Sequence, residues 1–195
     1  MLATFADQGM RIYQVLILLL IWSAPSMAQG DSSRTQRIGL SYLSEGGFYP
    51  GFAFNYEQKL LANQSFQLLL AAKAGAYFHY QNHTGIFVMV QSGQRFRIHK
   101  KLYVEHFLGI GYLQSFLNGG DAYYVNAAGQ VQKANSTGNG HFMPSISFGL
   151  SYDHPKGKHP FMVFVRPMVF WQIPFNEASL VQYAFEIGTL FKLKK

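Results

Sequence analysis

The C-terminal segment 181–193 constrains the fold most, because its residues alternate between two kinds of side chain. The odd positions are apolar or aromatic apart from one threonine: Val181, Tyr183, Phe185, Ile187, Thr189, Phe191 and Leu193. The even positions between 182 and 192 are small or polar apart from Leu190. An alternation with a period of two indicates a β-strand with one apolar face. The direction of that face decides whether the sheet encloses an apolar core or meets lipid.

Residues 10–28 have the features of an export signal. The basic start Met10–Arg11 precedes an uncharged run at 15–22 and small residues that end at Ala28. This order is typical of a secretory signal peptide, and the run is shorter than the ~20 residues that a spanning helix needs. We expect residues 1–28 to be a signal peptide and 29–195 to be the mature domain, with Met1 and Met10 both open as the start.

The composition favours a membrane protein. The chain is 49% hydrophobic and 16% aromatic, but only 13% of its residues are charged, against about a quarter in soluble domains. It has no cysteine, which excludes disulfides and cysteine-based metal or nucleophile sites. A closed β-barrel in lipid is the expected solution for an exported chain of this kind. The net charge of +7 comes from scattered basic residues, which argues against nucleic-acid binding.

Turn-forming residues divide the mature chain into eight strand-like segments. They are residues 36–45, 50–60, 65–80, 85–98, 101–117, 141–153, 160–173 and 179–193. The one long connection, 118–140, is largely polar. The sequence therefore predicts an all-β protein, an eight-stranded antiparallel up-and-down transmembrane β-barrel after an N-terminal signal peptide. With both ends in the periplasm, the odd-numbered connections would lie outside the cell, and the long one among them.

Charged residues share one face of these segments. That face carries Glu57, Lys73, Arg95, Arg97, Glu105, Arg166 and Glu186. If the turns centre on Lys100 and Asn176, the cross-strand neighbours are Arg95 with Glu105 and Arg166 with Glu186. Buried charges need partners, so we predict that both are ion pairs inside the barrel lumen. A lipocalin-like carrier with these charges in water is the alternative.

The closing segment resembles the C-terminal assembly signal of bacterial outer-membrane barrels. The matching positions are Glu186, Gly188, Phe191 and Leu193, and the chain continues with two lysines. Over all eight strands the mature chain resembles the small outer-membrane proteins such as OmpX, OmpW and the barrel of OmpA. The resemblance implies location in the bacterial outer membrane, contact with its lipids, insertion by its assembly machinery and a lumen filled by side chains. It implies no reaction and no cofactor.

The expected function is therefore non-enzymatic, with the role carried by extracellular loops or by membrane structure itself. An eight-stranded barrel is narrow enough for side chains to fill, which argues against a porin. One alternative is a conduit for small hydrophobic compounds, suggested by Met143, Met162, Phe164, Met168 and Phe170. Another is a lipid A-modifying enzyme, for which the candidate residues are His79, His83 and Glu105. No metal-ligand spacing or phosphate-binding motif is present.

Three polar residues do not fit the apolar outer face. Ser92, Gln94 and His106 share the parity of the lipid-facing residues, and Gln94 and His106 are predicted neighbours. Polar groups in hydrocarbon are costly unless they are satisfied. The sequence leaves three explanations open: a mutual hydrogen bond, a β-bulge that reverses the parity, or contact with a partner.

Overall fold

The computed structural model describes residues 35–80, 83–117, 123–125, 129–133, 138–155, 160–175 and 178–193. The predicted signal peptide, 1–28, lies outside these residues. The strands are β1 (Gln36–Glu45), β2 (Tyr49–Ala62), β3 (Phe66–His79), β4 (His83–His99), β5 (Leu102–Leu117), β6 (Tyr123–Val125), β7 (Val131–Lys133), β8 (Asn139–Phe142), β9 (Ser145–His154), β10 (Phe161–Phe175) and β11 (Ala178–Lys192). Within the described ranges, no helix has the length and apolar character to cross a membrane.

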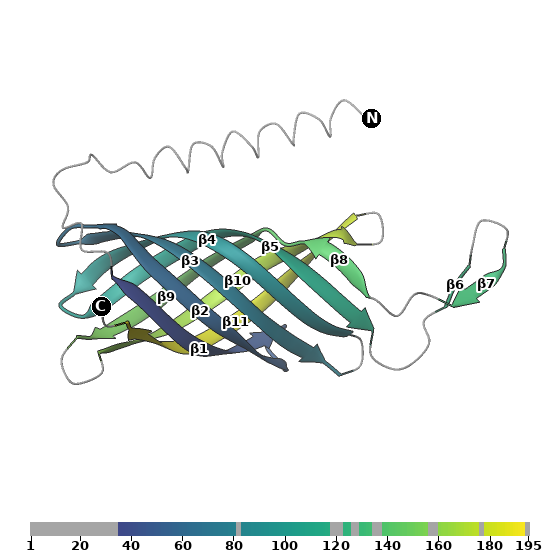
Figure 1. The fold of residues 1–195 in the computed structure, drawn as a ribbon, viewed down its shortest axis with the longest axis horizontal. Helices are drawn as coiled ribbons and strands as arrows, with labels where there is room; N and C mark the ends of the chain where they lie inside the picture. The colour runs from purple at the N-terminus through teal and green to yellow at the C-terminus, as the bar shows by residue number, and fades with distance from the viewer. Residues whose placement is uncertain are drawn as a thin grey trace, which may run out of the picture. The chain divides into compact units, whose positions relative to one another are not determined.

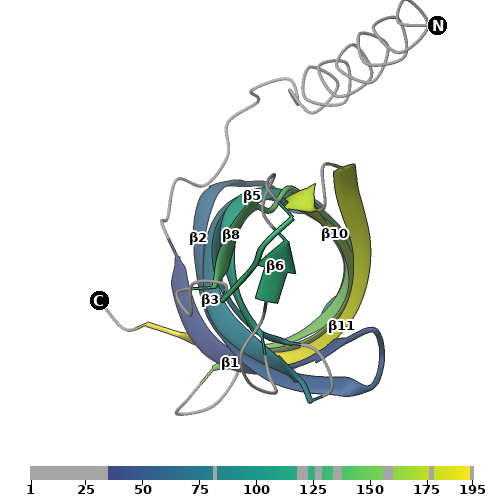
Figure 2. The same cartoon turned by 90° about the vertical axis from the view of Figure 1, so that its right-hand side faces the viewer.

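The long strands close into an antiparallel barrel, seen from the side in Figure 1 and nearly end-on in Figure 2. The strands β1 to β5 pair in chain order, β1 with β2 and so on to β4 with β5. Strands β8 and β9 together fill one position between β5 and β10. The barrel closes where β1 pairs with β11, from Arg37 opposite Lys192 to Glu45 opposite Ala184. These pairings confirm the predicted eight-stranded, antiparallel, up-and-down barrel.

The sixth barrel position differs from the continuous strand that we predicted. It is divided between β8 and β9 at Met143–Pro144, because proline has no N–H to donate to the ladder. The backbone stays paired on both sides of the break. The N–H of Met143 donates to the carbonyl of Gly111 at 2.8 Å, and Trp171 donates to the carbonyl of Pro144 at 3.0 Å.

The long connection 118–138 contains structure that the sequence analysis did not predict. Its strands β6 and β7 form a separate two-stranded antiparallel sheet, with Tyr123 opposite Lys133 and Val125 opposite Val131. Figure 1 shows this hairpin apart from the barrel sheet. Because the connection joins the ends of β5 and β8, the hairpin belongs to the end of the barrel where the predicted outer connections lie.

The apolar side chains face outward along the barrel wall. Leu40 is 56% exposed, Ile110 is 62% exposed and Tyr183 is 65% exposed. The charged residues predicted to share the other face are buried, with the exception of Arg97. Because a wall that is apolar outside and charged inside suits hydrocarbon rather than water, the lipocalin-like orientation is wrong.

Candidate functional site

Two carboxylates and two guanidiniums meet in the middle of the lumen. The side chains come from β2 (Glu57), β4 (Arg95), β5 (Glu105) and β10 (Arg166). Arg95 places Nε 2.6 Å from Glu105 and Nη2 2.8 Å from Glu57. Arg166 places Nε 2.6 Å from Glu105 and Nη2 2.6 Å from Glu57. Each carboxylate is therefore shared by both arginines, and the formal charges of the four groups cancel.

A second ion pair lies beside this network. Lys73 Nζ is 2.5 Å from Glu186 Oε2, and the Ser41 hydroxyl donates to Glu186 Oε1 at 2.6 Å. The side-chain amide of Asn55 in turn donates to the Ser41 oxygen at 2.8 Å. All four side chains are buried. The lumen is thus crossed by charged groups that are paired with one another, as buried charges require.

One of the two predicted ion pairs is present and the other is replaced. Arg95 and Glu105 are opposite each other in the ladder and are bonded. Arg166 is opposite Glu186, but its ion pairs go to Glu57 and Glu105. The predicted pairing of Arg166 with Glu186 is therefore wrong. The register identifies neighbours along the sheet, whereas a long inward side chain in a narrow barrel reaches groups on other strands.

Arg97 also departs from the prediction. It follows Arg95 on the same face of β4, but its side chain is exposed. The ladder shifts register between Arg97 and His99, at the end of the strand. There the guanidinium lies over the Tyr103 ring, 5.5 Å from its centroid, and marks the rim of the lumen rather than its interior.

The residues suggested as the lining of a conduit fill the lumen instead. Their side chains are at most 2% exposed: Met143, Met162, Phe164, Met168 and Phe170. The Arg166 guanidinium packs on Phe164 and Phe107, with its carbon 3.9 Å and 4.5 Å from the two ring centroids. The five residues therefore belong to the packed core of the lumen and do not line an open path.

A serine and a histidine meet in the barrel mouth at the end of the long connection. Ser115 Oγ lies 2.9 Å from Nε2 of His141, and Nδ1 of His141 lies 2.6 Å from the Pro174 carbonyl oxygen. A carbonyl only accepts, so in the neutral imidazole Nδ1 carries the proton and Nε2 accepts from the serine hydroxyl. A second acceptor for this hydroxyl, the Asn139 carbonyl, is 3.2 Å away. Three separate strands supply the group, so no sequence spacing predicted it.

The residues suggested for a lipid A-modifying enzyme are not assembled into one site. His83 Nε2 is 3.0 Å from the Tyr77 hydroxyl. The ring of His79 stacks on Tyr49 with centroids 3.5 Å apart, and its Nδ1 is 3.8 Å from Glu45. Glu105 lies in the central ion network. Within the described ranges, no group of three or more His, Cys, Asp or Glu residues is placed to hold a metal ion.

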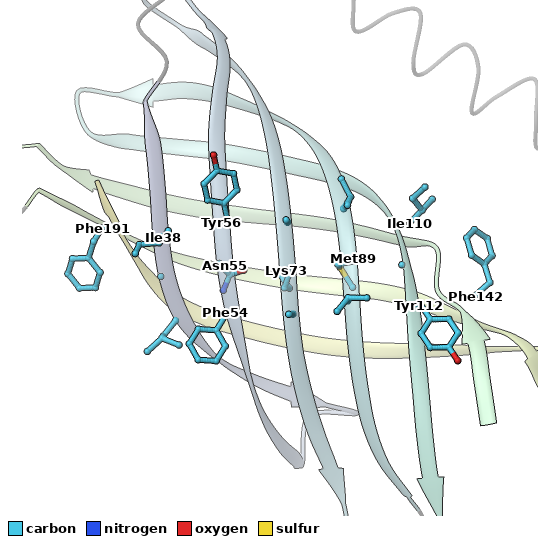
Figure 3. Close-up of a pocket in the computed structure, with 17 residues that line it drawn as sticks. Ile38, Phe54, Asn55, Tyr56, Lys73, Met89, Ile110, Tyr112, Phe142 and Phe191 are labelled. Carbon is cyan, nitrogen blue, oxygen red and sulfur yellow. The ribbon is translucent and has the colours of Figure 1, made fainter. Parts of the chain in front are cut away.

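The outer wall carries an apolar groove of about 990 Å³ over β1 to β5. The small side chains Ala72 and Ala74 lie between larger residues of β2 and of β4 and β5. Figure 3 shows Phe54 and Tyr56 on one side and Ile110 and Tyr112 on the other, with their side chains pointing away from the lumen. The groove opens on the outward, apolar wall of the barrel.

The polar residues Gln94 and His106 lie on the same face of their strands as the outward apolar residues, as the alternation predicted. Gln94 and His106 are opposite each other, and the register between β4 and β5 is unbroken from His83 to Arg97. A β-bulge is therefore not the explanation. The imidazole of His106 lies between the rings of Phe96 and Phe148, each with its centroid 6.2 Å away. Both side chains are described, and no hydrogen bond joins Gln94 to His106. Of the three explanations, contact with a partner is the one that the structure does not test.

Solved structures resemble this chain in fold, whereas comparisons of its sequence found no match. No family model matches the chain, and no curated protein matches its sequence. The N-terminal β-barrel domain of Pseudomonas aeruginosa OprF matches over 85% of this chain and 100% of that domain, at 12% identity and a TM-score of 0.52. Neisserial surface protein A matches over 86% of this chain and 100% of its own chain, at 8% identity and a TM-score of 0.48. Ail of Yersinia pestis matches over 85% of this chain and 100% of its own chain, at 15% identity and a TM-score of 0.45. The chain has the fold of the small eight-stranded bacterial outer-membrane β-barrels.

Proposed function

We propose that the protein is a non-enzymatic barrel of the bacterial outer membrane whose role lies in its outer connections or in membrane structure itself. The observation that carries this proposal is the lumen, where Glu57, Arg95, Glu105 and Arg166 form a closed, charge-balanced network. A barrel filled in this way offers no wide aqueous path. The apolar outer wall supports residence in lipid.

Fractionation and conductance test this proposal together. The protein should be found in the outer-membrane fraction, be extracted only by detergent and change its gel mobility on heating. Reconstituted in a planar bilayer, it should give no steady current of the size that porins give. A soluble periplasmic protein would overturn the location, and a persistent large conductance would overturn the filled lumen.

The outer-membrane assembly machinery is the partner that we propose for the C-terminal strand. Phe191 and Leu193 are 48% and 37% exposed on the outer wall, whereas Glu186 is buried in the lumen. Two apolar side chains at the end of the closing strand, one in β11 and one directly after it, are available to a partner before β11 pairs with β1. Glu186 and Gly188 complete the assembly signal that we predicted from the sequence.

A second candidate function is ester hydrolysis, and the contact between Ser115 and His141 is the specific observation that favours it. A hydroxyl, a base and a group that orients the base form the arrangement of an activated nucleophile. In this reaction Ser115 Oγ would attack the ester carbonyl while its proton passes to Nε2 of His141. The proton would then go to the departing alkoxide, and water would release the acyl group.

Lipid A analysis and an active-site probe distinguish the two candidates. The purified protein is treated with a fluorophosphonate, which labels activated serines, and the lipid A of a deletion strain is compared with wild type. The non-enzymatic proposal expects no labelling and unchanged lipid A acylation. Labelling that is lost in Ser115→Ala would instead establish the hydrolytic candidate.

A further inference from the structure

Basic residues outside the lumen gather at one end of the barrel. This end, here called the basic rim, holds the start of β1, the end of β11 and the connections after β2, β4 and β9. The lysines and arginines described at the basic rim are Arg37, Lys59, Arg97, Lys100, Lys101 and Lys192. In the described part of the chain, the acidic residue at this end that does not belong to the lumen networks is Asp153, paired with Arg37 at 2.9 Å.

The opposite end of the barrel lacks this charge. The described ends of β1 to β5 and β8 to β11 on that side carry no lysine or arginine. The one described basic residue of the long connection is Lys133, in β7. The remaining described basic residues, Lys73, Arg95 and Arg166, are buried in the lumen. The positive charge of the barrel surface is thus concentrated at one rim.

Four of the charged groups of the basic rim are available to a ligand. Arg97, Lys100 and Lys192 are exposed and Lys101 is half-buried. Among the described residues, no carboxylate lies within ion-pair distance of these four. Lys101 Nζ lies 5.8 Å from the centroid of the Tyr152 ring, which faces outward. A lysine that packs on an outward aromatic ring holds its ammonium close to the wall of the barrel.

Aromatic residues place the basic rim at the depth of lipid headgroups. Phe66 and Phe96 pack together with ring centroids 5.2 Å apart, and Phe161 stacks on His154 at 5.1 Å. Phe191 is also exposed at this end. Aromatic belts mark the level at which hydrocarbon gives way to headgroups. The rim residues lie beside or beyond this belt, so their charges reach the layer that contains phosphate.

We propose that the basic rim binds the phosphodiester headgroups of anionic phospholipids in the leaflet that surrounds this end of the barrel. The charges are spread over β1, β2, β4, β11 and the turn 100–101, which suits a ring of separate headgroups better than one compact acidic protein. Opposite charge attracts anionic lipid over a range of about a Debye length. With the long connection outside the cell, this leaflet is the periplasmic one.

Spin-labelled lipids test the proposal. The full-length protein, purified from membranes, is reconstituted in phosphatidylcholine vesicles that contain a minor share of phosphatidylglycerol. The protein-bound fractions of labelled phosphatidylglycerol and labelled phosphatidylcholine are then compared. We expect a preference of about threefold for phosphatidylglycerol at low salt, which disappears near ~1 M salt. Equal association of both lipids with the wild-type protein at low salt would overturn the proposal.

Variants in the exposed turn locate the effect. The double variant Lys100→Gln with Lys101→Gln should lose at least about half of the preference, because it removes two of the rim cations. Gln64→Ala changes a neutral, exposed turn residue of the same rim and should keep the full preference. Heat-modifiable mobility verifies that each variant is folded. An unchanged preference in the folded double variant would contradict the assignment.

Inorganic phosphate distinguishes a headgroup site from a site for the free anion. If the rim recognises headgroups held in a membrane, phosphate should reduce the preference no more than sodium chloride of equal ionic strength. A selective loss with phosphate would show that the rim binds the free anion and would overturn the lipid as its ligand.

Discussion

The Nε atom of Arg166 lies 2.6 Å from a carboxylate oxygen of Glu105, although the residue opposite Arg166 in the ladder is Glu186. The contact joins β10 to β5, two strands separated by the sixth barrel position. Through the same guanidinium, β10 is also tied to Glu57 of β2. The charges of the lumen therefore brace the barrel across its interior, in addition to the backbone ladder that joins adjacent strands.

Glu105→Gln should destabilise the barrel by ~3–5 kcal/mol, because it leaves two buried guanidiniums with only the carboxylate of Glu57 to share. Urea unfolding of the protein inserted in vesicles measures the change in the free energy of unfolding. Asp153→Asn is the matched control. Its partner is Arg37 at the basic rim, where both side chains retain contact with water, so its loss should cost at most about 1 kcal/mol. Equal effects of the two variants would show that the lumen network contributes little.

Gly39→Ala should disrupt the seam that closes the barrel. A Cβ atom at Gly39 would lie 1.8 Å from the backbone oxygen of Thr189 and 2.9 Å from the Cα of Leu190. Backbone atoms cannot move aside without shifting β11 away from β1, so we expect a low yield of folded barrel. The measurement is the fraction that shows heat-modifiable mobility. The neighbour Leu40→Ala, which shortens an outward side chain, should fold nearly as well as wild type.

A protease added to intact cells should cut, if anywhere, between Gly119 and Gly140. This stretch covers the long connection after β5 and the first two residues of β8, and long connections of such barrels are extracellular. Mass spectrometry of the released fragments identifies the cleavage site. Cleavage confined to the segment from His154 to His159 would mean that the barrel is inserted with the opposite orientation. In that case the basic rim would face the outer leaflet.

Phe191→Asp should block membrane insertion but leave export and signal cleavage intact. Phe191 is opposite Ile38 in the closing seam and is 48% exposed on the wall. A carboxylate at this position would remove an apolar position of the proposed assembly signal and place a charge at the membrane interface. The measurement is outer-membrane yield in a strain that lacks periplasmic proteases.

Val131→Asp is the control for this variant. Val131 is 68% exposed in β7 of the long connection, where a new charge should not affect insertion. If the Phe191 variant reached the outer membrane in the same amount as the control, with normal heat-modifiable mobility, the C-terminal segment would not act as an assembly signal.

The number of strands, their order and their two faces were predictable from the sequence. An alternation with period two is a local property, so each segment shows by itself which side chains share a face. Short turns then give the register of adjacent strands, and on this basis Arg95 is correctly placed opposite Glu105. The division at Pro144 and the β6–β7 hairpin were missed. The break depends on a single residue, Pro144, which lacks an N–H. The hairpin was missed because its strands have only three residues each, too few to show an alternation.

The contacts across the lumen were not predictable in the same way. Which carboxylate Arg166 reaches depends on how closure of the barrel brings β2, β5 and β10 together around one axis. The contact of Ser115 with His141 and the Pro174 carbonyl likewise joins three strands that share no sequence spacing. The sequence by itself determined a membrane barrel with charges inside, because alternation and short turns are local. Only the tertiary structure decided the partners of those charges and gathered the surface cations at one rim, because closure sets the distances between residues far apart in the chain.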